Sequence, residues 1–320
     1  MAMPPDVPFR VEGIASDTPE IESRVQIADS PPPTISVVVC TRDRARRLST
    51  CLHHLALARS ACSHVSEIVV VDNGSRDDTR DIVHAHAETL PIRCVLEARP
   101  GLSIARNRGI VAARGALIAF TDDDCNVDRD WMQAIVDAFA SRPELSILGG
   151  MVAPADDGDR TVSLRTHGEA KSVVSADAIL AVMSGCNMAF RRDVFGRIGG
   201  FDPAFGKGRR IGSAEDLDFM YRALRCGLSI LYLPHVVVRH AHGRDSEAAV
   251  AEVNREYVRG RGAFYWKFIT DRHIARMAYW EIAGLLARKP RGAGAWRTLR
   301  TLAVGAAFQS LPSLRETAPR

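Results

Sequence analysis

The sequence lacks any run of about 18 consecutive apolar residues, so it predicts no helix that crosses a membrane. Its first residues carry acids and no apolar core, which is unlike a secretory signal peptide. The seven cysteines are odd in number and none have CxxC spacing, which argues against a disulfide framework or a zinc knuckle. We therefore expect a cytoplasmic protein, with peripheral attachment to the inner face of the cell membrane left open.

Lysine is also scarce, because only Lys171, Lys207, Lys267 and Lys289 stand among 42 basic residues. The net charge of +4 is small and argues against a nucleic acid as partner. Charge is nevertheless uneven, since residues 246–320 hold 13 Lys and Arg against six Asp and Glu. A basic segment attached to a nearly neutral body predicts contact with an anionic surface.

Apolar runs rich in β-branched residues alternate with helical patterns along the first half of the chain. The expected strands cover residues 35–41, 67–73, 92–98, 116–122 and 146–153. Between the first two strands we expect a helix that ends at about residue 59, and the later helices are expected over 77–88, 103–114 and 129–141. This alternation predicts an α/β fold with a mostly parallel sheet and helices on both faces.

Three parts are expected along the chain. Residues 1–33 contain seven of the sixteen prolines and are typical of a disordered tail. Residues 34–245 are expected to form the α/β domain, and residues 246–320 a helical extension that is basic and rich in aromatic residues.

Polar clusters follow three of the expected strands, at residues 41–44, 72–75 and 121–124. In open parallel sheets, ligands bind at the carboxyl ends of the strands. Three consecutive aspartates, 122–124, repel one another unless a cation neutralises them, and oxygen ligands favour magnesium or manganese. In an extended segment Asp122 and Asp124 would point the same way and face one metal. The alternative is a solvated turn that leads to a helix cap at Asp128.

Six segments together carry a more specific signal. They are ISVVVCTRDR, EIVVVDNGSRDDT, GLSIARNRGI, FTDDD, SGCNMAFRRDVFGRIGGFD and SAEDLDFMYRALRCG, in this order. Over residues 35–242 the combination resembles glycosyltransferase family 2, whose members have the GT-A fold. The resemblance implies an inverting transferase that takes a sugar from a nucleotide-sugar donor, with Mn2+ or Mg2+ as cofactor.

The resemblance also guides the assignment of individual residues. We assign Thr41, Arg44, Asp72, Asn107, Asp122 and Asp123 to the nucleotide, Asp122, Asp124 and His240 to the metal, and Glu215 and Asp216 to catalysis. Asp72 matches the aspartate that binds a pyrimidine base, which favours UDP- or dTDP-sugars. Asp216 matches the general base.

Several of these assignments have a structural alternative. Asp216 in the first turn of a helix could merely complement the helix dipole. His240 could be a structural histidine, and His242 is an equally near rival for the metal. Residues 106–108 could form an exposed helix face in place of a donor contact.

Glycosyl transfer needs two separate groups of acidic residues. Displacing a nucleoside diphosphate requires neutralisation of its charge, which a divalent cation provides. The acceptor hydroxyl must also lose its proton on the opposite face, and one carboxylate can accept it. A nucleotidyltransferase or a dinucleotide-binding enzyme would need a glycine-rich loop after the first strand, and CTRDRARR has no glycine. A relative that binds nucleotide sugars without catalysis stays open.

The extension interleaves basic and aromatic residues in RGRGAFYWKF (259–268) and again over 288–308. One interpretation is an amphipathic helix on an anionic membrane, which would bring the enzyme to a glycan or lipid-linked glycan acceptor. The other is packing of these aromatic residues against the catalytic domain or against a second copy in a homodimer.

Overall fold

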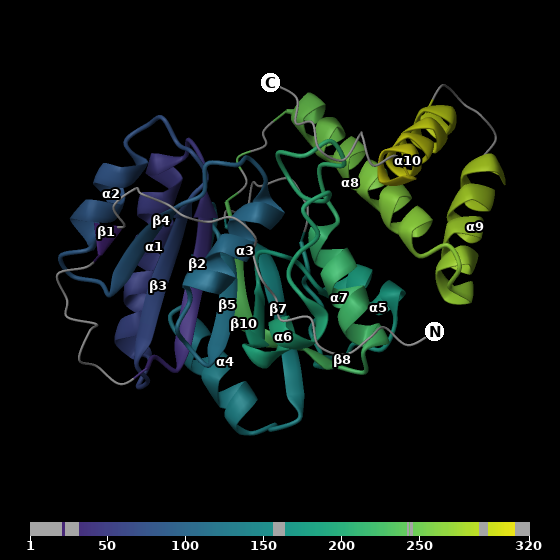
Figure 1. The fold of residues 1–320 in the computed structure, drawn as a ribbon. Helices are drawn as coiled ribbons and strands as arrows, with labels where there is room; N and C mark the ends of the chain where they lie inside the picture. The colour runs from purple at the N-terminus through teal and green to yellow at the C-terminus, as the bar shows by residue number, and fades with distance from the viewer. Residues whose placement is uncertain are drawn as a thin grey trace. The chain divides into compact units, whose positions relative to one another are not determined.

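The computed structural model describes residues 21–22, 32–155, 164–241, 243, 246–287 and 294–310 (Figure 1). Contacts between residues divide the chain into two compact units. The first unit contains Met1–Arg99, Ile104–Gly200 and Met220–His242, and the second contains Pro100–Ser103, Phe201–Phe219 and Gly243–Arg320. The second unit therefore combines the end of the chain with two short segments from the motif-bearing region.

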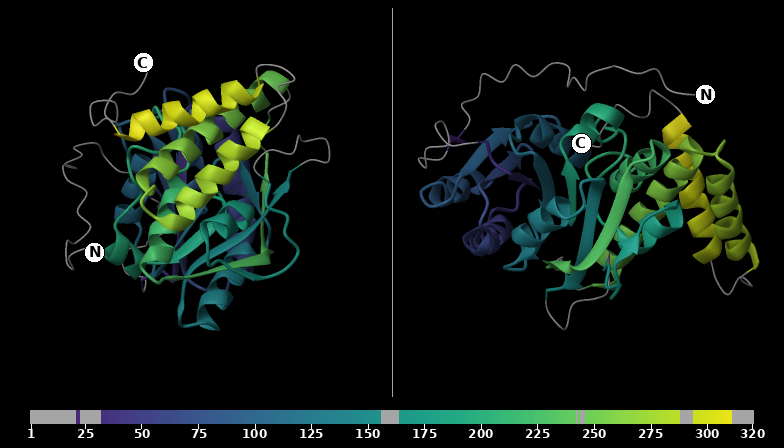
Figure 2. Two further views of the ribbon diagram at one scale, coloured as in Figure 1. Left: turned by 90° about the vertical axis from the view of Figure 1, so that its right-hand side faces the viewer. Right: turned by 90° about the horizontal axis from the view of Figure 1, so that it is seen from below.

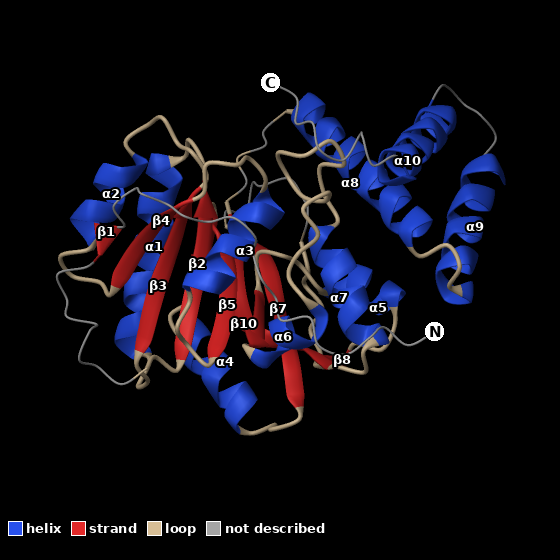
Figure 3. Cartoon of the chain, in the orientation of Figure 1, coloured by secondary structure: helices blue, strands red, loops and turns tan. Residues whose placement is uncertain are grey.

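The strands of the first unit form one ten-stranded, mostly parallel sheet (Figure 3). They are β1 (Ile21–Glu22), β2 (Ile35–Thr41), β3 (Ser66–Asp72), β4 (Ile92–Leu96), β5 (Leu117–Asp122), β6 (Cys125–Val127), β7 (Leu145–Pro154), β8 (Lys171–Ser172), β9 (Met188–Arg191) and β10 (Ser229–His240). Their order is β1-β4-β3-β2-β5-β9-β7-β10-β6, with β8 paired to β10. Parallel pairing of β3, β2 and β5 brings their carboxyl ends to the same end of the sheet.

Helices cover both faces of this sheet, as the alternating sequence pattern predicts. The sequence predicts α1 (Ala45–Ala61), α2 (Thr79–His86), α3 (Leu102–Ala112) and α4 (Trp131–Ala140), but not α5 (Ala176–Val182) and α6 (Asp193–Ile198). On one face, Leu52 of α1, Val83 of α2 and Trp131 of α4 share a buried core with Val37 and Val70. Burial of these side chains on folding is the main force that holds the layers together.

The opposite face of the sheet carries α3 and α6. Val38 and Val71 point to it, because successive side chains of a strand alternate between the faces. Gly109 of α3 lies so close to this face that a Cβ there would collide with Val38 Cγ1 and lie 3.2 Å from Val71 Cγ2. On the same face, Phe195 of α6 packs on Phe190 with ring centroids 5.3 Å apart. The sheet is thus covered on both sides, and its carboxyl end carries the polar clusters.

Three short strands, β1, β6 and β8, are not predicted from the sequence. Of the tail expected over residues 1–33, only 21–22 and 32–33 lie within the described residues, and Ile21–Glu22 pair antiparallel with β4. Two residues separate β6 from the end of β5, and β6 runs antiparallel to β10. The segment that follows Asp122 is therefore a turn and a strand.

The second unit contains three long helices, α8 (Glu247–Lys267), α9 (Arg272–Ala287) and α10 (Gly294–Ser310), as the sequence pattern predicts. α8 and α10 lie side by side in both views of Figure 2. They approach closely at two glycines, since a Cβ on Gly262 would collide with the carbonyl of Leu302, and one on Gly305 with the carbonyl of Arg259. Among the helices that the structure describes, none combines the length and hydropathy that a membrane crossing requires.

Candidate active site

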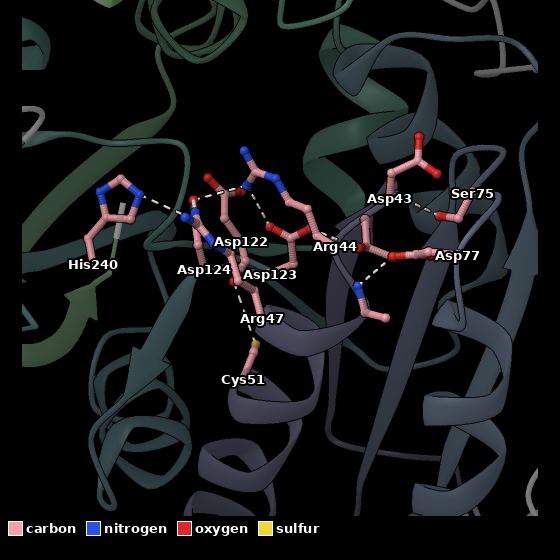
Figure 4. A network of polar contacts seen from close by, with 12 residues as sticks. Asp43, Arg44, Arg47, Cys51, Ser75, Asp77, Asp122, Asp123, Asp124 and His240 are labelled. Atoms are coloured by element: carbon pink, nitrogen blue, oxygen red, sulfur yellow. Dashed lines mark hydrogen bonds and ion pairs between the residues drawn. The ribbon is translucent and has the colours of Figure 1, made fainter. Parts of the chain in front are cut away.

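The aspartates of residues 122–124 lie where β5 gives way to β6, at the carboxyl end of the sheet (Figure 4). The pairing of β6 with β10 puts His240 opposite Cys125, and the Ala241 N–H donates to the carbonyl oxygen of Asp124 at 2.8 Å. The His240 Nε2 lies 3.2 Å from Asp124 Oδ1. Strand pairing thus brings the histidine to the aspartates from a distant part of the chain.

Two arginines also reach this turn. Arg44, which precedes α1, has its Nη1 at 2.9 Å from Asp123 Oδ1 and 3.0 Å from Asp124 Oδ2. Arg47 Nη1 lies 3.3 Å from the same oxygen of Asp124. Thr41, at the end of β2, donates to Asp123 Oδ2 at 2.7 Å. Buried carboxylates and half-exposed guanidinium groups therefore alternate across the end of the sheet.

Arg106 of α3 is the buried cation of this cluster, with 2% of its side chain exposed. Its Nη2 lies 3.3 Å from Asp122 Oδ1 and donates to the carbonyl oxygen of Gly185 at 3.2 Å. These two partners offset the cost of removing a guanidinium from water. Asn107 is buried next to it, and residues 106–108 as a whole are buried. They do not form the exposed helix face considered above.

Burial and charge separate the pKa values of the two carboxylates in the turn. Burial raises the pKa of Asp123 to about 6, although the charge of Arg44 opposes this shift. Burial also raises the pKa of Asp124, but the hydrogen bond from His240 and the charges of His240, Arg44 and Arg47 outweigh it and lower this pKa to about 2. The pKa of His240 is lowered by burial, but its hydrogen bond to Asp124 and nearby negative charges raise it to about 9. Asp124 is therefore ionised at neutral pH, and a metal that binds His240 would have to displace the proton of the imidazole.

The donor atoms at this turn fit a divalent cation. Ligand atoms of Asp124, Cys125 and His240 all lie within 4.8 Å of one another. A carboxylate together with an imidazole suits a divalent transition metal such as Mn2+. Burial raises the pKa of the Cys125 thiol well above its ordinary value, and a thiol suits softer metals than Mn2+ or Mg2+. His242, the rival for the metal, lies outside the described residues.

Asp72 lies at the same end of the sheet, because it is the register partner of Thr41 across β3 and β2. Only 1% of it is exposed. Its Oδ1 accepts a hydrogen bond from the Ser75 N–H at 2.7 Å, and its Oδ2 lies 3.4 Å from Arg80 Nε. Asn73 Nδ2 donates to two carbonyl oxygens in the loop after β4, both at 2.8 Å. The polar groups after β3 are thus tied to neighbouring loops.

Glu215 and Asp216 begin helix α7 (Glu215–Arg225), and both belong to the second unit. Glu215 is buried and Asp216 is half-buried. The preceding Ala214 has a φ of 69°, a left-handed conformation that is strained for a residue with a Cβ. Such strain persists where the surrounding contacts enforce it. One of these contacts is with α8, where a Cβ on Gly260 would lie 2.9 Å from Ala214 Cβ.

The structure places the predicted site residues in two groups. Thr41, Arg44, Asp72, Asn107, Asp122, Asp123, Asp124 and His240 belong to the first unit, and Glu215 and Asp216 to the second. Sequence reasoning misses Arg47 and Cys125. Arg47 could be found because it stands three residues after Arg44, at the spacing that places side chains on one face of a helix. Cys125 reaches the histidine only through the pairing of β6 with β10, for which the local sequence has no signal.

The chain is similar to known glycosyltransferases. The family model described as Glycosyltransferase like family 2 matches residues 31–258. The chain is 25% identical over 267 residues to Glycosyltransferase AglE of Haloferax volcanii, which covers 81% of this chain and 83% of that protein. It is also 25% identical over 224 residues to the Glucosyl-dolichyl phosphate glucuronosyltransferase of the same organism, covering 64% of this chain and 68% of the relative.

A solved structure shares the fold. Mannosyltransferase PcManGT from Pyrobaculum calidifontis, in complex with GDP-Man and Mn2+, has a TM-score of 0.61 to this chain at 23% sequence identity. The match covers 89% of this chain and 80% of that protein. The architecture of the first unit is therefore the GT-A fold.

Proposed function

The chain belongs to glycosyltransferase family 2 and is a glycosyltransferase, and from this premise we propose that it inverts the anomeric carbon as it moves a sugar from a nucleotide-sugar donor to a hydroxyl group. The observation that carries the proposal is the meeting of Asp124, His240 and Arg44 at the carboxyl end of the sheet. A cation site next to an accessible guanidinium group suits a diphosphate. UDP- or dTDP-sugars are favoured through Asp72, and the acceptor is proposed to be a glycan or a lipid-linked glycan.

On the donor side, Asp122, Asp124 and His240 are proposed to hold a divalent metal. When bound, the metal neutralises the charge of the leaving diphosphate. Arg44 is half-exposed, so its guanidinium can turn from the carboxylates to a phosphate oxygen. Asp123 and Thr41 would orient the ribose, and buried Asn107 would support the nucleotide site. The Asp72 carboxylate would accept the N3–H of a pyrimidine.

On the acceptor side, Asp216 is the proposed general base, with Glu215 beside it. As the acceptor oxygen attacks the anomeric carbon, its proton passes to the Asp216 carboxylate. The bond from that carbon to the diphosphate breaks on the opposite face. Entry and departure on opposite faces invert the configuration.

Metal-dependent nucleotide binding tests the donor side. UDP, GDP and dTDP are titrated calorimetrically into the full chain, in Mn2+ and again in EDTA. We expect UDP or dTDP to bind in Mn2+, with affinity roughly 100-fold lower in EDTA, because a divalent metal held by these residues would neutralise the charge of the diphosphate. Equal affinity in Mn2+ and EDTA would refute the metal assignment. Because PcManGT is solved with GDP-Man, GDP is included, and a preference for it would refute the assignment of Asp72 alone.

Helix α9 is proposed to bring the enzyme to an anionic membrane at the inner face of the cell. The α9 outer face consists of the exposed side chains of Arg272, Arg276, Tyr279, Trp280, Ile282 and Leu286. Most of these residues have a neighbour in the set three or four positions away, so they lie on one side of the helix. Tyr279 and Trp280 are 63% and 65% exposed. Two arginines with exposed aromatic residues suit anionic headgroups and the apolar layer beneath them.

The single acid of α9 is directed away from this face. Glu281 lies 2.9 Å from Arg261 Nη2 and accepts a hydrogen bond from Tyr265 Oη at 2.6 Å, both on α8. The α9 outer face therefore carries positive charge alone, which complements an anionic bilayer. A relative named as a glucosyl-dolichyl phosphate glucuronosyltransferase is in keeping with a lipid-linked acceptor.

Flotation of the full chain with vesicles tests this surface. We expect binding to phosphatidylglycerol vesicles and not to phosphatidylcholine vesicles. The double variant Arg272→Gln/Arg276→Gln should bind roughly 30-fold more weakly, because each basic residue near an anionic surface contributes about 1 kcal/mol. Arg129→Gln, at another exposed arginine, is the matched control and should bind as the unaltered chain does. Absence of vesicle binding, together with self-association that the double variant abolishes, would instead identify a homodimer face.

A further inference from the structure

Lys267, at the end of α8, contacts the segment that contains the proposed base. We call residues 201–219 the base segment. The Lys267 Nζ lies 2.6 Å from Asp218 Oδ1 and 2.7 Å from Asp202 Oδ2. It also lies 5.2 Å from the centre of the Phe205 ring. Asp218 is 0% exposed and stands two residues after Asp216 in the first turn of α7. A cation from α8 thus neutralises a fully buried carboxylate in the same helical turn as the proposed base.

A second lysine makes the converse contact, from the base segment to α8. Lys207 Nζ donates to both carboxylate oxygens of Glu256, at 2.6 and 2.7 Å. Ser213 Oγ donates to the Glu256 carbonyl oxygen at 2.8 Å. Arg259 Nη1 donates to the carbonyl oxygen of Arg210, also at 2.8 Å. α8 therefore holds the base segment at several points along its length.

Both of these contacts use lysine, although arginine is by far the commoner basic residue of the chain. Lysine provides only four of the 42 basic residues, yet two of the four join α8 to the base segment. An ammonium group is a compact point charge, whereas a guanidinium group is a planar fork. Between two carboxylates and an aromatic ring, the compact cation fits the space at Lys267.

We propose that Lys267 is a positioning residue for the general base, and that α8 is therefore part of the catalytic machinery. Lys267 neutralises Asp218, which fixes the first turn of α7 and with it the carboxylate of Asp216. The inference rests on the proposed function, because it takes Asp216 as the base. Without the ammonium group, buried Asp218 would lose the cation that lies 2.6 Å from its carboxylate, and that turn would have to rearrange. A displacement of about 1 Å at a reacting group can cost 100-fold in rate.

Lys267→Met in the full chain tests the proposal with two readouts. Hydrogen–deuterium exchange is followed in peptides from residues 201–219 and, for comparison, 117–127. We expect faster exchange in the base segment alone. In assays of nucleoside diphosphate release during transfer, kcat should fall about 10- to 100-fold. The donor KM and the affinity for UDP in Mn2+ should stay within about two-fold, because the proposed donor residues belong to the first unit.

A double variant separates the charge of Lys267 from its bulk. Lys267→Met/Asp218→Asn also removes the carboxylate that the ammonium group of Lys267 neutralises, so most of kcat and of the exchange protection should return. The control is Arg255→Gln, which changes an exposed residue of α8 paired with exposed Glu252. It should leave exchange and kcat unchanged.

Three results would overturn the proposal. They are unaltered exchange over residues 201–219 in Lys267→Met, a parallel loss of donor affinity and kcat, and failure of the double variant to recover. If the unaltered chain transfers no sugar, the proposed function fails instead. The exchange measurement then still reports whether Lys267 holds the base segment.

Discussion

Replacing Asp124 by alanine should abolish metal-dependent nucleotide binding. In the structure this carboxylate lies within 3.3 Å of His240, Arg44 and Arg47, so its removal takes away the negative charge that all three cations share. The affinity for UDP in Mn2+ should fall roughly 100-fold, to the level measured in EDTA, because Asp124 is a proposed ligand of the metal. Calorimetric titration in Mn2+ and in EDTA measures both values.

The matched control for this change is Asp128→Asn. Asp128 is an exposed carboxylate just after β6 and pairs with exposed Arg239 at 3.0 Å. An exposed ion pair contributes little to stability, so this variant should bind UDP within about two-fold of the unaltered chain. Melting temperatures show whether either variant is unfolded. Persistent Mn2+-dependent binding by a folded Asp124→Ala protein would rule out its assignment as a metal ligand.

Replacing Asp216 by asparagine should remove transfer and spare the donor. The amide has nearly the same shape as the carboxylate but does not accept the proton of the acceptor hydroxyl. We expect kcat to fall about 10²- to 10⁴-fold, the usual contribution of a general base. Affinity for UDP in Mn2+ should change by less than about two-fold. Steady-state transfer and calorimetry together measure the two effects.

A helix-dipole role for Asp216 predicts a different result. An acid in the first turn of a helix typically contributes about 0.3–1 kcal/mol to stability. Asp193→Asn removes such an acid from the first turn of α6, and it should lower the melting temperature slightly without changing kcat. If Asp216→Asn behaves in the same way, Asp216 serves the helix and not the reaction. Equal loss of donor binding in Asp124→Ala and Asp216→Asn would contradict the separation of roles.

The central strands could be predicted from the sequence because their residues are buried on both faces. β2 has the same bounds as the strand predicted over 35–41. β3 begins and ends one residue earlier than predicted, and β5 begins one residue later. The short length of these runs and their β-branched residues favour a buried strand over a buried helix. β6 has three residues, and it forms only because β10 lies beside it. No pattern local to residues 125–127 predicts that partner.

The candidate site likewise has a part that the sequence predicts and a part that it does not. The aspartates 122–124 and the pair Glu215-Asp216 stand out as motifs, because each is contiguous in sequence. Their contacts come from residues far away in the sequence. Arg106 of α3 pairs with Asp122, and Lys267 pairs with Asp218, which lies 49 residues before it. The contact-based units also divide the chain differently from the predicted domains, since they group Phe201–Phe219 with the helical extension. Such grouping arises in three dimensions and leaves no periodicity in the sequence.

The length of α8 has a consequence for protein engineering. The family match ends at residue 258, in the middle of this helix, whereas α8 continues to Lys267 and packs on α10 through Gly262. A protein shortened at the end of the recognisable motifs would keep Glu256 and lose Lys267 together with the packing partner of the helix. A chimaera of two relatives that is to keep these contacts would therefore need the base segment and the terminal helices from the same parent.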